Sequence, residues 1–166
     1  MKQNFLGHNL DILCIFNSPV DNNIFLTGSM DETAKIWDIR AGEAVQTFQN
    51  ASCVNTLCWL GNGSAFFTGS DDGSSSLFDL RSYCQLHKIQ DDSIHFGVTS
   101  SDISKGNRFL VTGYDNCQAI LWDILAEKSL IYPLSSHRDK VSCLSFDNDG
   151  QSICTGSWDM LLKIWS

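Results

Sequence analysis

The sequence predicts an all-β fold in which antiparallel sheets of four strands are arranged like the blades of a propeller. The main observation is a repeated motif, in which Thr-Gly is followed by a turn-forming Asp or Asn and then by an aromatic residue. The motif recurs every 41 to 44 residues, beginning at Thr27, Thr68, Thr112 and Thr155. Repeats of this length that contain a Trp-Asp dipeptide are typical of four-stranded propeller blades. The segments between motifs are short β-type runs without helical periodicity.

The repeats place four blades at residues 9–48, 53–89, 97–132 and 140–166, within one domain spanning residues 1–166. In the first blade, strands are expected at 12–16, 24–27, 34–37 and 44–48, separated by turn residues such as Asn17-Ser18-Pro19. The second blade repeats this order, and its Gly61-Asn62-Gly63 predicts a tight hairpin. The third and fourth blades follow the same pattern around turns at 105–107 and 147–150.

The two ends of the chain do not determine whether the blades form a closed ring. The last repeat is one strand short, and residues 3–6 are expected to form an outer strand that supplies it by β-pairing. Three arrangements fit: a small closed ring of four blades, an open arc of four blades, and the carboxyl-terminal part of a larger propeller, represented by a truncated product or gene model. Only four repeats are present, so the fold is expected to be a partial propeller or a small closed ring.

Composition narrows the class of partner. The net charge is −8 with only 11 Lys and Arg, which argues against nucleic acid or an anionic membrane surface as the main partner. The seven Cys form no C-x-x-C pair and are typical of a reducing compartment, and we expect no metal site and no cofactor. No apolar run reaches the roughly 18 residues of a membrane span. We therefore expect a cytoplasmic protein without direct membrane insertion.

Within the first and last repeats, polar residues are spaced as a hydrogen-bond network. A buried Trp indole needs an acceptor, a Thr hydroxyl both accepts and donates, and a His joins the Thr to the turn Asp. The expected members are His8, Thr27, Asp31 and Trp37, and then His137, Thr155, Asp159 and Trp165. We interpret both sets as structural, because a hydrolytic triad needs an exposed nucleophile beside oxyanion donors. The second repeat has Asn50 and Phe78 at these places and the third has Asn116, so blade two should be the loosest.

A candidate binding edge follows from the same periodicity. The residue just before each turn Asp or Asn should lie at one edge of the blades, and these residues are Met30, Asp71, Asp115 and Trp158. The starts of the innermost strands, at Asp11-Ile12-Leu13 and Val54-Asn55, open onto the same edge. A Trp at such a turn has no core to fill, and Trp is enriched among residues that dominate interface energies. The alternative is an aromatic ring folded onto a neighbouring loop.

The motifs carry a family resemblance. The chain resembles the last four WD repeats of the β subunit of heterotrimeric G proteins, and the similarity is clearest in Thr68-Gly69-Ser70-Asp71-Asp72, Leu77-Phe78-Asp79-Leu80-Arg81, Thr112-Gly113-Tyr114-Asp115, 138–144 and 156–165. The resemblance implies a non-catalytic scaffold of seven blades that binds α and γ subunits and effectors in G protein-coupled receptor signalling. It also implies a place at the inner face of the plasma membrane, reached through partners.

By this resemblance, the partner-facing residues are Asp11, Leu13, Met30, Asn55, Asp71 and Trp158. One departure lies at Cys53, where the family has an Asp and where one preceding residue is missing, so a charge is lost from the edge. Two other functions remain. The first is a generic WD-repeat adaptor in another multi-protein complex, or a truncated product with impaired assembly. The second, an enzyme, is disfavoured because no constellation of catalytic residues is present.

Overall fold

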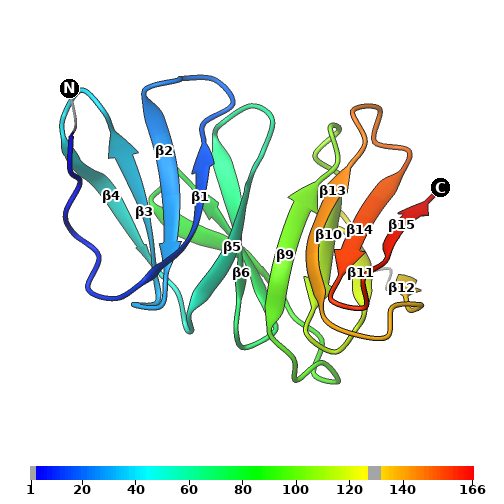
Figure 1. Ribbon diagram of the computed structural model, residues 1–166. Coiled ribbons are helices and arrows are strands. Elements are labelled where there is room, and N and C mark those ends of the chain that lie inside the picture. Colours follow the sequence, from blue (N-terminus) through cyan, green and yellow to red (C-terminus); the bar gives the residue numbers. More distant parts are fainter. Residues whose placement is uncertain (1–2, 127–131) are drawn as a thin grey trace.

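The computed structural model describes residues 3–126 and 132–166, and within these ranges it contains strands and no helix (Figure 1). Four separate antiparallel sheets follow one another along the chain, which confirms the predicted all-β propeller blades. Blade one contains β1 (Ile12–Asn17), β2 (Ile24–Ser29), β3 (Thr33–Asp38) and β4 (Glu43–Gln49). Blade two contains β5 (Val54–Trp59), β6 (Ala65–Ser70), β7 (Ser75–Asp79) and β8 (Cys84–Ile89).

Blade three contains β9 (Val98–Ile103), β10 (Phe109–Tyr114), β11 (Ala119–Asp123) and β12 (Tyr132–Leu134). Its last strand runs past the predicted boundary at residue 132. Blade four has three strands, β13 (Val141–Phe146), β14 (Ile153–Ser157) and β15 (Leu162–Trp165). None of the described residues lies in a helix long and apolar enough to cross a membrane.

The innermost strands of neighbouring blades pack against one another, β1 against β5, β5 against β9, and β9 against β13. All four line a common hollow of about 360 Å³, in which small polar side chains such as Thr56, Thr99 and Ser101 predominate. Figure 1 shows the blades in chain order, with the blue first blade and the red last blade at opposite ends. The four sheets are therefore arranged about a common centre.

Residues 3–6 do not form the predicted outer strand, and this prediction was wrong. A strand needs a neighbour that pairs its backbone N–H and C=O groups, whereas this segment lies over aromatic side chains of blade one. The ring of Phe5 contacts Phe25 and Trp37 edge-on, at centroid distances of 5.2 and 5.8 Å. The segment is thus held by ring packing.

Apolar cores fill the spaces between blades. One cluster joins blades one and two through residues such as Leu26, Phe48 and Phe66, and a second joins blades two and three. At each junction a glycine of β2, β6 or β10 faces a valine at the start of the next blade. A Cβ built on the glycine would approach the valine Cγ1 to 2.5, 2.6 or 2.8 Å, in the pairs Gly28–Val54, Gly69–Val98 and Gly113–Val141. These positions require glycine because the next blade occupies the space of a side chain.

Candidate functional site

The structure brings the predicted turn residues to one edge of the four blades, in equivalent positions. In each blade, the backbone N–H of the residue before the turn Asp or Asn donates to a carbonyl at the start of the innermost strand. The pairs are Met30 to Asp11 (3.0 Å), Asp71 to Cys53 (3.1 Å), Asp115 to Gly97 (3.2 Å) and Trp158 to Lys140 (3.0 Å). We call these eight residues, together with the bulge residues below, the rim.

Every innermost strand has a one-residue register shift beside the rim. Such β-bulges leave one residue out of the ladder and redirect its side chain. The bulge residues are Leu13, Asn55, Thr99 and Ser142. All four line one hollow of about 410 Å³ together with Asp71, Lys140 and Trp158. Of the predicted residues, the structure therefore gathers Leu13, Asn55, Asp71 and Trp158 in this hollow, while Asp11, Met30 and Asp115 do not line it.

The hollow combines an apolar ring with fixed polar groups. Trp158 is 66% exposed, and the Lys140 ammonium lies 5.3 Å from the centroid of its ring, within the range of a cation–π contact. Asn55 Nδ2 donates to Asp71 Oδ1 at 3.2 Å and to the Val98 carbonyl at 3.0 Å, which fixes the Asn side chain between two blades. Lys140 holds Trp158 but leaves most of it available to a partner.

Sequence reasoning missed Lys140, Thr99 and Ser142. The signal was present, since Lys140 stands directly before its innermost strand as Asp11 does. Thr99 and Ser142 occupy the bulge position that Leu13 and Asn55 hold in the first two blades. The same positions in the third and fourth repeats therefore point to all three residues.

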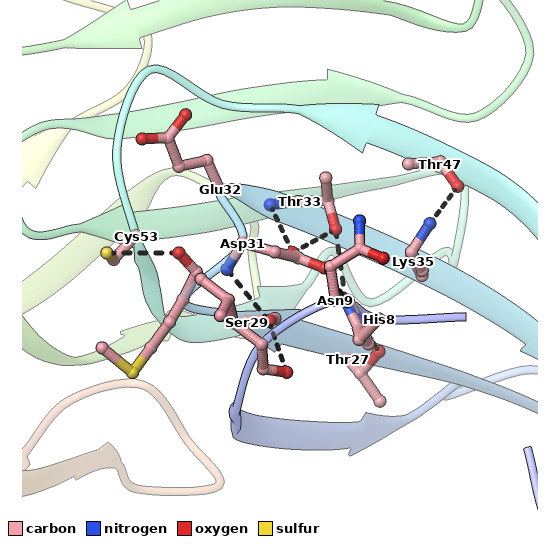
Figure 2. A network of polar contacts seen from close by, with 12 residues as sticks. His8, Asn9, Thr27, Ser29, Asp31, Glu32, Thr33, Lys35, Thr47 and Cys53 are labelled. Carbon is pink, nitrogen blue, oxygen red and sulfur yellow. Dashed lines mark hydrogen bonds and ion pairs between the residues drawn. The ribbon is translucent and has the colours of Figure 1, made fainter. Parts of the chain in front are cut away.

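The network residues of blade one are in contact, as Figure 2 shows for His8, Thr27 and Asp31. His8 Nδ1 lies 2.9 Å from Asp31 Oδ2, and His8 Nε2 lies 2.6 Å from Thr27 Oγ1. Trp37 Nε1 donates to Thr27 Oγ1 at 2.8 Å. Because an ionised Asp31 only accepts, His8 donates from Nδ1 and accepts the Thr27 hydroxyl proton at Nε2. The donors then run in one direction from Trp37 to Thr27 to His8, and His8 donates in turn to Asp31.

Blade four repeats this arrangement. His137 lies 2.9 Å from Asp159 and 2.8 Å from Thr155, and Trp165 Nε1 donates to Thr155 at 3.0 Å. In blade two, Thr68 donates to Asn50 Oδ1 at 2.8 Å, while the buried Asn50 Nδ2 has no hydrogen-bond partner among the described residues. An incomplete buried network stabilises less than a complete one, so a looser blade two remains our prediction.

The acidic members of the two complete networks have lowered pKa values. Burial alone would raise the pKa of Asp31, but hydrogen bonds from Thr33, Asn9 and His8 outweigh it and hold the pKa well below its usual range. Burial is likewise outweighed at Asp159, whose pKa is lowered by hydrogen bonds from the Arg138 backbone, His137 and the Leu161 backbone. Both carboxylates are thus stabilised in the folded state as anions.

These shifts predict loss of stability in acid. A group whose pKa is lower in the folded than in the unfolded state stabilises fully above its unfolded value of about 3.9. That contribution is lost as the pH falls below this value towards the folded pKa. We expect the midpoint temperature of unfolding to decrease as the pH is lowered below about 4. In Asp31→Asn, this decrease should be less steep. An equal slope in the variant, measured by circular dichroism, would contradict the assignment.

Four repeated blades whose equivalent loops form one rim define a propeller protein built from repeats. The family model described as "WD domain, G-beta repeat" matches residues 1–38, 42–79, 86–123 and 128–166. The chain belongs to this WD40 repeat family. It is also similar to proteins named guanine nucleotide-binding protein subunit beta, at 41% identity for that of Solanum tuberosum, 42% for Arabidopsis thaliana and 39% for Oryza sativa subsp. japonica.

Each of these alignments covers 96% of the chain and 45% of the relative. The chain therefore spans less than half the length of the curated relatives that it matches.

Proposed function

We propose that the chain is a non-catalytic scaffold of the G protein β subunit type, forming a single propeller domain, and that its rim binds the G protein α subunit. The observation that carries this proposal is the hollow at the rim, in which Trp158, Leu13, Asp71 and Lys140 from three blades converge. An exposed aromatic ring beside an apolar side chain and charges of both signs has the composition of an interface hot spot. The similarity to named β subunits favours the α subunit as the partner.

Further partners follow from the same assignment. We propose that the protein also binds a γ subunit and effectors in G protein-coupled receptor signalling, and that it works in the cytoplasm. Its place at the inner face of the plasma membrane would depend on these partners. The net charge of −8 favours protein surfaces over nucleic acid.

The burial and hydrogen bonding of the His and Asp side chains agree better with a scaffold than with an enzyme. His8, His137 and their Asp partners have side chains that are almost fully buried, and they bond to one another within the blades. General acid–base catalysis needs such groups within hydrogen-bond reach of a substrate. Among the described residues, the lining of the rim hollow includes Asp71 and Lys140 but no His. We therefore assign the His–Asp pairs a structural role.

A second candidate, a WD-repeat adaptor of another multi-protein complex, is favoured by one rim residue. Cys53 stands where the resembling family has an Asp, and its thiol donates to the Met30 carbonyl at 3.5 Å (Figure 2). With Cys53 in place of an Asp, the rim presents one negative charge fewer to a partner at this position. Loss of a rim charge alters association rate and partner choice.

Binding measurements on rim variants test the proposal. We expect Trp158→Ala and Asp71→Ala each to weaken binding of the GDP-loaded α subunit by about 30-fold, the equivalent of about 2 kcal/mol for a hot-spot residue. Tyr83→Ala is the matched control, since Tyr83 is 70% exposed but lies in the turn after β7, at the opposite edge of blade two. Biolayer interferometry on an immobilised α subunit gives the affinities.

Unchanged affinity in both rim variants would contradict α-subunit binding at this rim. If the wild-type chain binds neither α nor γ subunits, even when further repeats are supplied as a separate chain, the signalling assignment fails. The adaptor function would then be the better description.

A further inference from the structure

In blades one and four, the carboxylate of the turn Asp is held by a buried His. Asp31 Oδ2 lies 2.9 Å from His8 Nδ1 and accepts from the Asn9 backbone N–H at 2.9 Å (Figure 2). Asp159 Oδ2 is bonded in the same way to His137 and to the next backbone N–H, at 2.9 and 3.0 Å. Both His side chains are almost fully buried. Water and salt therefore have little access to either contact.

A lysine takes the place of this His in blade two. Asn50, at the position of the His, accepts from Thr68, and its Nδ2 has no partner among the described residues. Asp72 Oδ2 instead accepts from Lys88 Nζ at 3.1 Å. Lys88 belongs to the outer strand β8, and its side chain is 35% exposed. Within the described part of the chain, blade two is thus the one blade whose turn Asp pairs with its outer strand.

The other oxygen of Asp72 closes the turn at the rim. Asp72 Oδ1 accepts from the Ser74 backbone N–H at 3.0 Å and from the Ser74 hydroxyl at 2.6 Å. Burial alone would raise the pKa of Asp72, but the hydrogen bonds from Ser74 and Lys88 outweigh it and lower that pKa. The ionised carboxylate therefore joins the outer strand to the backbone of residues 70–74.

This turn carries Asp71 into the rim hollow. The Asp71 backbone N–H donates to the Cys53 carbonyl at 3.1 Å, and Asp71 Oδ1 accepts from Asn55 Nδ2 at 3.2 Å. Both bonds depend on where the turn places Asp71. A partly exposed ion pair holds a turn less firmly than a buried His does, because water and salt compete for exposed charges. The position of Asp71 therefore depends on the contact between Lys88 and Asp72.

We infer that Lys88 is a positioning residue for the rim, which holds the turn of blade two and so fixes Asp71 in the rim hollow. The outer strand of blade two is thereby coupled to the rim, although Lys88 does not line the hollow. All of these groups lie in or beside blade two, whose innermost strand packs between β1 and β9. The consequence for partner binding rests on the proposed function, in which Asp71 contacts the α subunit.

Hydrogen exchange measured by NMR tests the role of Lys88 without any partner. In Lys88→Met, the backbone N–H groups of Ser74 and Asp71 should exchange about threefold faster at low salt, the effect expected for a partly exposed ion pair. Raising the salt concentration should accelerate the same two groups in the wild type, because salt screens exposed charges. The Thr33 N–H, which donates to Asp31 Oδ1 at 3.1 Å, is the internal control and should not respond.

Two further variants separate the ion pair from other effects of the substitution. Lys88→Arg keeps the positive charge and should retain the protection of Ser74. Lys35→Met is the matched control, since Lys35 Nζ donates to the Thr47 hydroxyl at 2.9 Å and not to a carboxylate (Figure 2). It removes the same charge from blade one and should leave exchange in blade two unchanged.

Affinity for the GDP-loaded α subunit, measured by biolayer interferometry, tests the consequence for the rim. Lys88→Met should weaken binding about threefold, the same factor by which it loosens the turn. Lys35→Met should leave the affinity unchanged. Adding Lys88→Met to Asp71→Ala should cause no further loss, because Lys88 acts through Asp71.

Unchanged exchange at Ser74 and Asp71 in Lys88→Met would overturn the inference, whether or not the α subunit binds. Faster exchange with unchanged affinity, or additive losses in the double variant, would overturn the positioning of Asp71 by Lys88. If the wild-type chain binds no α subunit, the proposed function fails, while the exchange rates still decide whether Lys88 holds the turn.

Discussion

Replacing Trp122 by alanine is expected to lower the free energy of unfolding by about 3–5 kcal/mol, the usual cost of truncating a large buried aromatic residue. Trp122 is 1% exposed and belongs to the core cluster between blades two and three. Its Nε1 also donates to Thr112 Oγ1 at 2.7 Å. The variant therefore leaves both a cavity and an unused acceptor. Urea unfolding followed by circular dichroism measures the change.

Trp158→Ala is the control for this effect. Its ring is mostly exposed at the rim, so its removal should change the free energy of unfolding by no more than about 0.5 kcal/mol. The two Trp variants thus separate stability from binding, since only Trp158→Ala is expected to weaken the proposed partner contact. Similar losses of stability in both would contradict the assigned burial.

Gly69→Ala is expected to cost at least about 1–3 kcal/mol by overpacking. The added Cβ would lie 2.5 Å from Thr56 Cγ2 and 2.6 Å from Val98 Cγ1, and both side chains are buried. Neither neighbour can withdraw without disturbing the contact between blades two and three. Thermal unfolding compared with wild type gives the loss.

Gly106→Ala provides the matched control, because no atom of the residues that the structure describes lies within 4 Å of its added Cβ. It should shift stability by no more than about 0.5 kcal/mol. Adding Val98→Ala to Gly69→Ala removes one of the two clashes, so the double variant should lose less than the sum of the single variants. Full additivity would show that the valine does not cause the strain.

Local patterns made the blades predictable. A Thr, a turn Asp or Asn and an aromatic residue at constant spacing determine two strands and the turn between them. The order of strands and the position of Trp158 at the rim follow from that spacing. The network of His8 with Thr27 and Asp31 was predictable for the same reason, since each donor requires a matching acceptor.

Features that depend on distant partners were not predictable in this way. Residues 3–6 were expected to pair because the last repeat is one strand short, but whether they pair depends on a free sheet edge being within reach. The repeat marks the positions of Thr99 and Ser142, but the bulges there are backbone features that depend on how each innermost strand pairs with its neighbour. The position of Lys140 before its strand can be read from the repeat, but the contact of its ammonium with the ring of Trp158 depends on the folded arrangement.

The bulges separate the pairing of the innermost strands from the choice of side chains displayed at the rim. One backbone geometry recurs in all four innermost strands, yet it displays a leucine, an asparagine, a threonine and a serine at Leu13, Asn55, Thr99 and Ser142. Since these residues stand outside the ladder, their identity is free to vary without shifting the register of their neighbours. The side chains that line the rim hollow can therefore differ from blade to blade while the strand pairing beside them stays the same.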